Sequence, residues 1–256
     1  MKIYLTILGC GSSLGVPRAD GYWGKCNKKN KKNYRSRCSL AISRGKNVIL
    51  IDTSPDLRSQ LLANKIKNIS SVLYTHQHAD QTHGINDLRV FYFKNKKKID
   101  IYANYQTLKY LKKSFTYCFK KKLGYNSIVK ANLLTPYFSL GERNEKIFFE
   151  SVTVSHGLIN SVGYIFNKTA YISDCNKLSK SNIKKLEDLK LLIIDCLRLN
   201  PHPSHLNLDQ VLELIDTVKP KKAILTNLHS DLDYNFLLKN TPANVKPAYD
   251  GMRISI

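Results

Sequence analysis

The sequence lacks the signatures of several common protein classes. No apolar run comes near the ~20 residues that a membrane-spanning helix requires, so we expect no membrane partner. The apolar start of the chain is too short for an export signal, and we expect a cytoplasmic protein. The six cysteines form no C-x-x-C pair, which argues against a zinc ribbon or a thioredoxin-like site; we expect them to be buried and reduced. No linker rich in glycine or proline divides the chain, so the sequence predicts one domain over residues 1–256.

Acidic residues are also scarce. Asp and Glu total 19 against 41 Lys and Arg, which gives a formal net charge of +22. A basic surface attracts anions, and RNA is a candidate partner on this ground. Most of the excess is lysine, in a chain that is also rich in Asn and Ile, and AT-rich coding would impose the same bias on any protein. The charge therefore fits a phosphate-bearing substrate without identifying one.

Apolar segments with the lengths of strands and helices follow one another along most of the chain. A long basic loop over 18–37 is expected to be solvated and flexible, with recruitment of anions as the alternative. Residues 81–90 can form a helix after a short buried strand at 71–74. Strands are further expected at 2–8, 38–42, 47–52, 99–103, 146–154, 161–167, 169–173, 191–195, 223–226 and 247–256, and helices at 52–64, 105–115 and 208–218. Hairpins first, and then strands alternating with helices, predict an α/β fold with sheets between helices.

Three of the seven histidines fall within the eight residues 76–83, directly after the expected strand at 71–74. His76 and His78 are two residues apart, so on an extended backbone their side chains leave from the same side. Two neutral imidazoles held in this way are good ligands for zinc, and Asp80 adds a charged oxygen. The alternative is a polar loop that happens to contain several histidines.

Other candidate ligands also stand directly after expected strands. His156 follows the strand at 146–154, Asp174 the one at 169–173, and His229 the one at 223–226. Strand ends on one side of a sheet edge converge, so residues far apart in the sequence can meet at one site. A lone histidine at any of these places would be unremarkable, but the repetition at one kind of position favours a shared metal site.

The order of these residues resembles that of the metallo-β-lactamase superfamily: His-x-His-x-Asp, then His, Asp and His at strand ends. Finer features are similar to the branch that contains phosphoribosyl cyclic phosphate phosphodiesterase and, more distantly, ribonuclease Z. These finer features are the segments 9–17 (GCGSSLGVP), 34–39 (YRSRCS), 87–89 (DLR) and 249–252 (YDGM). This resemblance spans nearly the whole chain. It implies an αββα sandwich of two mixed sheets flanked by helices, a centre of one or two Zn²⁺ or Mn²⁺ ions, and hydrolysis of a phosphodiester.

The resemblance also implies roles for single residues. His76, His78 and His156 would hold the first metal, Asp174 would bridge to the second, and Asp80 would bind that second ion. Asp80 would also orient or deprotonate the attacking water. Two further positions match the family outside the ligand set. Asp52 would support the loops, and His205 would protonate the leaving oxygen.

The chain departs from the family pattern at two positions of the second metal. Gln81 and Asn227 stand where the family usually has histidines, and in each case a histidine follows two residues later. A shift of two keeps the face of a strand, so we retain His229 as a ligand. On a helix the same shift turns a side chain by about 200°, which disfavours His83. The accessory zinc of the phosphonate enzyme also lacks its ligands, since only Cys26 remains of its cysteine cluster.

These observations favour a metal-dependent hydrolase that cleaves a small cyclic or nucleotide-like phosphodiester with metal-activated water. Two alternatives stay open: an RNA-processing nuclease of the ribonuclease Z type, and a binding protein whose second metal site has degenerated. Hydrolysis of a thioester or a lactam fits the phosphate-directed features less well. A homodimer is a further expectation from the resemblance.

Overall fold

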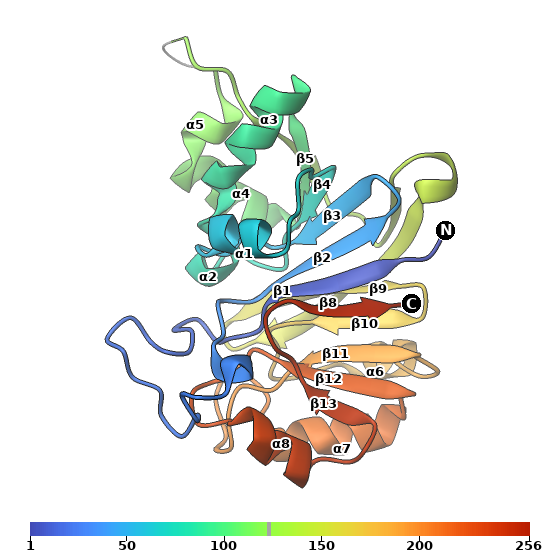
Figure 1. Cartoon of the computed structure of the whole chain (residues 1–256). Helices are drawn as coiled ribbons and strands as arrows, with labels where there is room; N and C mark the ends of the chain where they lie inside the picture. Colours follow the sequence, from blue (N-terminus) through green and yellow to red (C-terminus); the bar gives the residue numbers. More distant parts are fainter. Residues whose placement is uncertain (122–123) are drawn as a thin grey trace.

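Two β-sheets stacked face to face form the centre of the molecule, and helices cover their outer faces. The structure, a computed structural model, describes residues 1–121 and 124–256. Each sheet contains seven strands. Figure 1 shows the helices of the N-terminal half above the first sheet and those near the C-terminus below the second. The expected αββα sandwich is thus confirmed.

The first sheet carries the N-terminal half of the chain and one strand from the C-terminus. In the order in which they pair, its strands are β14 (Met252–Ser255), β1 (Tyr4–Gly9), β2 (Ser39–Arg44), β3 (Asn47–Ile51), β4 (Ser71–Leu73), β5 (Ile99–Ala103) and β6 (Val129–Leu133). The pair β2–β3 is the predicted hairpin. Strands β3 to β6 run parallel, so their carboxyl ends lie at one edge, where the loop with the clustered histidines follows β4.

The second sheet carries the C-terminal half. Its strands are β13 (Val245–Pro247), β12 (Lys222–Thr226), β11 (Leu191–Asp195), β10 (Thr169–Ile172), β9 (Ile159–Phe166), β8 (Ile147–His156) and β7 (Tyr137–Leu140). Strands β10 to β13 are parallel. Their carboxyl ends therefore bring Asp174, Asp195 and Asn227 to the same edge of this sheet.

Eight α-helices are found in the part of the chain that the structure describes. They are α1 (Leu57–Ala63), α2 (Ala79–Thr82), α3 (Arg89–Asn95), α4 (Tyr105–Ser114), α5 (Thr116–Phe119), α6 (Lys180–Lys185), α7 (Leu208–Val218) and α8 (Tyr234–Asn240). Helix α7 has the predicted bounds because Asn207 and Gln210 form a capping box at its start. Within the described ranges, no helix combines the length and the apolar character needed to cross a membrane.

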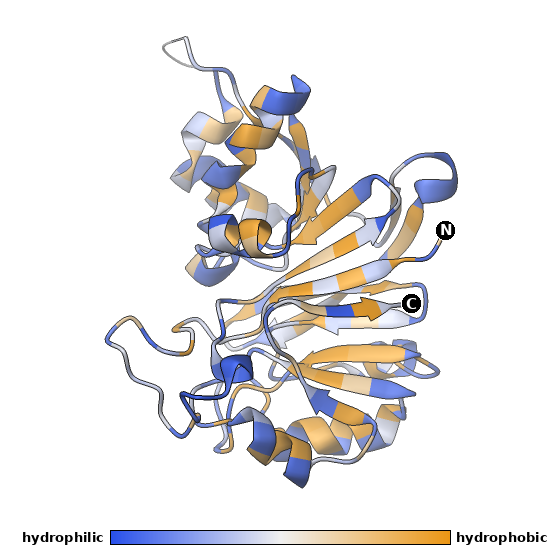
Figure 2. Ribbon diagram, viewed as in Figure 1, coloured by the Kyte–Doolittle hydropathy of each residue, from blue (hydrophilic) through white to orange (hydrophobic). Residues whose placement is uncertain are grey.

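Apolar side chains form three layers in this sandwich. One cluster lies between the two sheets, and two others lie between each sheet and its helices. The strands in Figure 2 are mostly orange, while the exposed sides of the helices are blue. All six cysteines are buried and unpaired, as expected. Burial on both faces gives the sheets the rigidity to hold side chains at their edges.

Two predicted elements differ from the structure. The expected helix over 81–90 is interrupted, because Gly84 packs against Ser54: an added Cβ would lie 2.1 Å from the Ser54 carbonyl oxygen. A 3₁₀ turn at Ile85–Leu88 follows this close approach and leads into α3. The expected strand over 247–256 consists of two, β13 and β14, which belong to different sheets. Gly251, with φ +84°, makes the turn between them.

The basic N-terminal loop is anchored, whereas a solvated loop was expected. Arg35 is buried, and its guanidinium donates to the carbonyl oxygens of His229 (3.2 Å) and Leu232 (2.7 Å) and to Asn33 Oδ1 (3.1 Å). Asn33 in turn donates to Asp233 Oδ2 at 2.6 Å. These contacts tie the loop, dark blue at the edge of Figure 1, to the segment before α8.

Candidate metal centre

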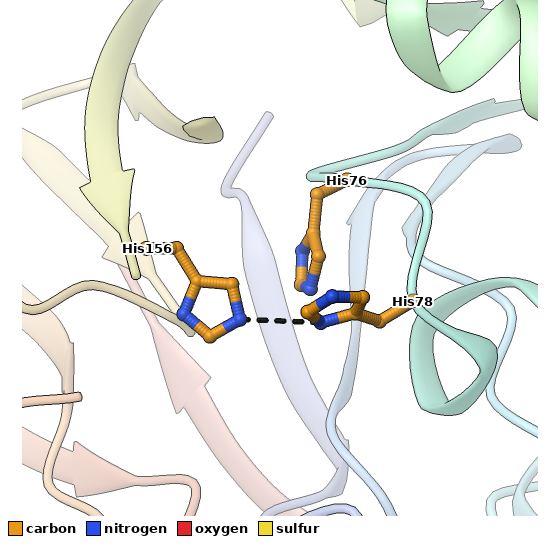
Figure 3. A group of neighbouring side chains, drawn as sticks. All are labelled: His76, His78 and His156. Atoms are coloured by element: carbon orange, nitrogen blue, oxygen red, sulfur yellow. Dashed lines mark hydrogen bonds between the residues drawn. The ribbon is translucent and has the colours of Figure 1, made fainter. Parts of the chain in front are cut away.

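Three imidazole rings point toward one another at the edge of the sandwich (Figure 3). His76 and His78 lie between β4 and α2, and His156 is the last residue of β8. The ring centroids are 4.6, 4.8 and 5.0 Å apart. One nitrogen of each ring lies within 4.8 Å of the other two. The structure thus brings together three of the predicted ligands, although 78 residues separate His78 from His156.

The hydrogen bonds of His76 leave one of its nitrogens free to bind a cation. The Thr75 hydroxyl donates to Asp52 Oδ2 at 2.8 Å, so it accepts the proton of His76 Nδ1 at 3.0 Å. His76 Nε2 therefore carries a lone pair. This nitrogen is buried and has no hydrogen-bond partner among the described residues. A buried acceptor without a partner is costly, and a bound metal would satisfy it.

The other two rings have the spacing of ligands on one ion. His156 Nδ1 donates to the Ser204 carbonyl at 2.7 Å, which leaves its Nε2 unprotonated. That Nε2 lies 3.2 Å from His78 Nδ1. Two nitrogens that each bind a tetrahedral zinc at ~2.0–2.1 Å are about 3.3 Å apart. The three side chains therefore fit a divalent metal of the kind that imidazole prefers.

Burial keeps these histidines neutral. It lowers the pKa of His76 to about 3, and it also lowers the pKa of His78 and of His156 below the ordinary value of histidine. Each ring therefore offers a lone pair at neutral pH, which is the form that binds metal.

Two predicted carboxylates accompany the histidines. Asp174 follows β10 and is buried, while Asp80 lies in α2. Burial, and after it the charge of Asp174, raise the pKa of Asp80 to about 6. Burial opposes ionisation of Asp174 as well, but its neighbours outweigh burial and lower the pKa of this carboxyl. These neighbours are the facing histidines, His76 first, whenever they carry a proton, and the Ser173 hydroxyl, which donates to Oδ2 at 2.7 Å. The side-chain amides of Gln81 and Asn227 each lie 3.2 Å from an oxygen of Asp174.

His205 lies next to His156 and is held by Asp195. Its Nδ1 is 2.7 Å from Asp195 Oδ2, and its ring centroid is 4.6 Å from that of His156. Burial lowers the pKa of His205, but the charge of Asp195 more than offsets this and raises it above the ordinary value. Burial also raises the pKa of Asp195 to about 7, so the pair competes for one proton. Donors from Cys175 and Asn227 stabilise the carboxylate, and we therefore place the proton on His205.

The two histidines that could replace the missing family ligands do not belong to the converging groups. His83 is exposed, and its Nε2 is 3.1 Å from the Tyr110 hydroxyl. His229 lines the same cavity as His156, but its Nδ1 is 3.0 Å from Asp231 Oδ1. Among the described residues, the converging groups are His76, His78 and His156, and His156, Asp174 and His205. The structure therefore does not bring His229 into these groups, and its role as a ligand stays a prediction.

A cavity of about 390 Å³ opens over these residues. Its walls include Ser12, Ser13 and Leu14 of the glycine-serine segment 9–17, and residues of the segment that follows β11. The lining residues are Ser12, Ser13, Leu14, His78, Asp80, His156, Asp174, Leu197, Arg198, His202, Ser204, His205, Asn227 and His229. The cavity has room for a small substrate beside the three imidazoles.

Residues 47–227 match the family model of the beta-lactamase superfamily domain. The chain belongs to this superfamily. The matched range includes both halves of the candidate centre, from His76 to Asn227. The family indicated by the resemblance in the sequence is thereby confirmed, together with the metallo-β-lactamase fold.

Solved structures of the superfamily share the whole fold. A diphosphatase of the PhnP family is 30% identical and superposes with a TM-score of 0.91, over 100% of this chain and 98% of its own. Zinc-bound PqqB from Methylobacterium extorquens is 15% identical, with a TM-score of 0.80 over 99% and 100%. The short form of human tRNase Z is 17% identical, with a TM-score of 0.71 over 99% of each chain. At 15% and 17% identity, the structures of PqqB and tRNase Z show only that the fold is shared.

A curated relative is longer than this chain. The octanoyltransferase of Porphyromonas gingivalis is 29% identical over 255 residues, which are 98% of this chain and 51% of the relative. The chain thus spans about half the length of this curated relative.

Two residues of the site were missed by reasoning from the sequence. Asp195 was read as the end of an apolar strand, although a carboxylate at a strand end is the same signal that marked Asp174. Ser12 lines the cavity, and its hydroxyl oxygen is buried without a partner among the described residues. The glycine-serine loop gave no sign of which of its serines would face the site.

Proposed function

We propose that this protein is a metal-dependent phosphodiesterase that acts on a small cyclic or nucleotide-like phosphate. The observation that carries the proposal is the convergence of three neutral imidazoles, two of which, His78 and His156, line a small cavity together with His205. When bound there, a divalent ion such as Zn²⁺ or Mn²⁺ supplies Lewis acidity, which activates water and neutralises phosphate charge. The nitrogen ligands favour zinc.

The chain's own groups have separate tasks in this proposal. Asp80, with a pKa of about 6, is suited to orient the attacking water and to accept its proton. His205, whose ring centroid is 4.6 Å from that of His156, carries a proton and donates it to the leaving oxygen. Asp195 keeps the His205 ring in place through the 2.7 Å hydrogen bond to Nδ1.

The size and charge of the cavity support a small anionic substrate. A volume of about 390 Å³ accommodates a sugar phosphate or a single nucleotide. Arg198 contributes a positive charge to the lining, and the net charge of +22 attracts phosphate to the surface. An RNA substrate stays a second prediction that rests on the basic surface, and salt-sensitive binding of tRNA would support it.

Cleavage of a diphosphate bond is a second candidate for the reaction. It is favoured by the similarity to the PhnP-family diphosphatase, which is 30% identical along the whole chain. Both reactions displace an oxygen at a charged phosphorus, so the same residues would serve.

The proposal is tested by hydrolysis assays after metal removal and reloading with Zn²⁺ or Mn²⁺. The panel contains bis(p-nitrophenyl) phosphate, 2′,3′-cyclic nucleotides, a phosphoribosyl cyclic phosphate and a dinucleoside diphosphate. We expect turnover of at least one diester, its loss after chelation, and its loss in His78→Ala. The matched control is His83→Ala, an exposed histidine of the same segment, which should retain wild-type turnover. Equal activity of the metal-free and the reloaded protein would overturn the proposal.

A further inference from the structure

Both oxygens of the Asp174 carboxylate are occupied by donors of the protein. Oδ1 accepts a hydrogen bond from Asn227 Nδ2 at 3.2 Å. Oδ2 accepts from the Ser173 hydroxyl at 2.7 Å and from Gln81 Nε2 at 3.2 Å. The two amides belong to the residues that stand where the family usually has histidines. Where a second metal would need ligands with lone pairs, this chain presents N–H groups.

The orientation of the Asn227 amide is fixed by its other partners. Nδ2 also lies 3.1 Å from the Ser173 carbonyl oxygen and 3.1 Å from Asp195 Oδ1. A carbonyl oxygen only accepts hydrogen bonds, so the NH₂ group and not the amide oxygen must face this side. A reversed amide would direct its oxygen at three other oxygens. Asn227 therefore offers the site hydrogen atoms, which repel a cation.

The Gln81 amide lies between the two carboxylates that a second ion would join. Its Nε2 is 3.2 Å from Asp174 Oδ2 and 3.4 Å from Asp80 Oδ2. Gln81 itself is fully buried, and its NH₂ group supplies hydrogen bonds to both acids from the protein interior. Gln81 Oε1 is buried without a partner among the described residues, so a turned Gln81 amide would offer this one oxygen to the site. The Asn227 amide could not turn as well, because Ser173 and Asp195 hold its NH₂ group.

No imidazole compensates for these amides among the described residues. His83 faces Tyr110 on the surface, and His229 belongs to neither group of converging ligands. The two groups of converging ligands share His156. One imidazole nitrogen binds one ion, so the two groups cannot be filled independently.

We propose that the centre is mononuclear: one ion on His76, His78 and His156, with the amides of Gln81 and Asn227 in place of a second ion. This inference rests on the metal centre of the proposed function. The two amides neutralise no charge. Their hydrogen bonds to Asp80 and Asp174 take the place of the contacts that a second ion would make with these carboxylates. The same carboxylates are thereby kept in position without a second metal.

Metal stoichiometry tests this inference without any assay of turnover. Protein loaded with excess Zn²⁺ or Mn²⁺ and then desalted is measured by elemental analysis and by native mass spectrometry. We expect one ion per wild-type chain, and fewer than ~0.2 in His78→Ala. The double variant Gln81→His/Asn227→His should hold two ions, and His83→Ala should hold one, like wild type.

The outcomes separate this inference from the proposed function. Two ions per wild-type chain would overturn the mononuclear centre and leave the phosphodiesterase proposal standing. If the wild-type protein binds no ion, then the proposed metal centre does not exist, and the proposed function fails together with this inference. If the double variant does not fold, titration of metal-free wild type with Co²⁺ decides: the visible absorption of the bound ion should stop rising at one equivalent. A rise that continues to two equivalents contradicts the inference.

Discussion

The Thr75 hydroxyl accepts a hydrogen bond from His76 Nδ1 because it gives its own proton to Asp52. Burial raises the pKa of Asp52, while the amide and the hydroxyl of Thr75 counteract this by stabilising the carboxylate. As long as Asp52 is ionised, the proton of His76 stays on Nδ1 and the lone pair stays on Nε2. A buried carboxylate that binds no ion itself therefore sets the state of a ligand.

Asp52→Asn should weaken metal binding without removing a ligand. The Asn side chain would donate to Thr75, whose hydroxyl would then turn toward His76 Nδ1 and shift the ring proton to Nε2. Loss of such a supporting partner typically costs 10–100-fold in metal affinity, at about 1.4 kcal/mol per tenfold. Zinc competition with a chromophoric chelator measures the effect.

The control for this change is Asp100→Asn. Asp100 lies in β5 of the same sheet and accepts from Asn132, away from the histidines. It should bind zinc within about twofold of wild type. If Asp52→Asn binds zinc as tightly as this control, the hydrogen-bond chain does not determine the state of His76.

His205→Asn should slow the reaction in a way that depends on the leaving group. A general acid contributes about 10²–10⁴-fold when the leaving oxygen needs a proton. A p-nitrophenolate leaves without being protonated, so the kcat for p-nitrophenolate release should fall by less than ~10-fold in this variant. Steady-state kcat for a cyclic nucleotide and for bis(p-nitrophenyl) phosphate, at one pH and saturating metal, measures the two losses. Equal losses for the two substrates would assign His205 to binding and not to proton transfer.

Local sequence patterns predicted most of the fold. The hairpin of β2 and β3 and the helix α7 are visible in the sequence, because alternation and capping residues lie within a few positions of one another. The break at Gly84 depends on the distant Ser54 carbonyl, and the turn at Gly251 separates strands of two sheets. Such contacts have no signal in the local sequence.

The candidate site was predictable to a similar extent. The spacing of His76 and His78 and the strand-end positions of His156 and Asp174 placed four residues that the structure brings close together. The amides of Gln81 and Asn227 reach Asp174 from 93 and 53 residues away. The sequence showed that two histidines were missing, but only the fold shows that N–H groups face the carboxylate in their place.

Zinc affinity should depend little on pH between 6.0 and 7.5. Burial lowers the pKa of His76 to about 3, and the pKa values of His78 and His156 are also below the ordinary 6.5. Since protons compete with metal only below a ligand's pKa, few protons are displaced in this range. Three ordinary imidazoles would lose about 50-fold in affinity from pH 7.5 to 6.0, whereas we expect a loss below ~5-fold. Competition titrations at the two pH values distinguish these cases.

Arg35→Met should destabilise the protein more than its place in a loop suggests. The substitution keeps much of the apolar volume but removes the donors to the His229 and Leu232 carbonyls and to Asn33. Buried acceptors that lose their partners cost about 1–3 kcal/mol each, less where water enters, so we expect a loss of about 2–4 kcal/mol in the free energy of unfolding.

Arg58→Met, on the exposed side of α1, is the matched control and should stay within about 0.5 kcal/mol of wild type. Urea unfolding measures both. A stable Arg35→Met protein would show instead that the loop is held by its remaining contacts, such as the one from the Lys25 amide to the Ser230 carbonyl.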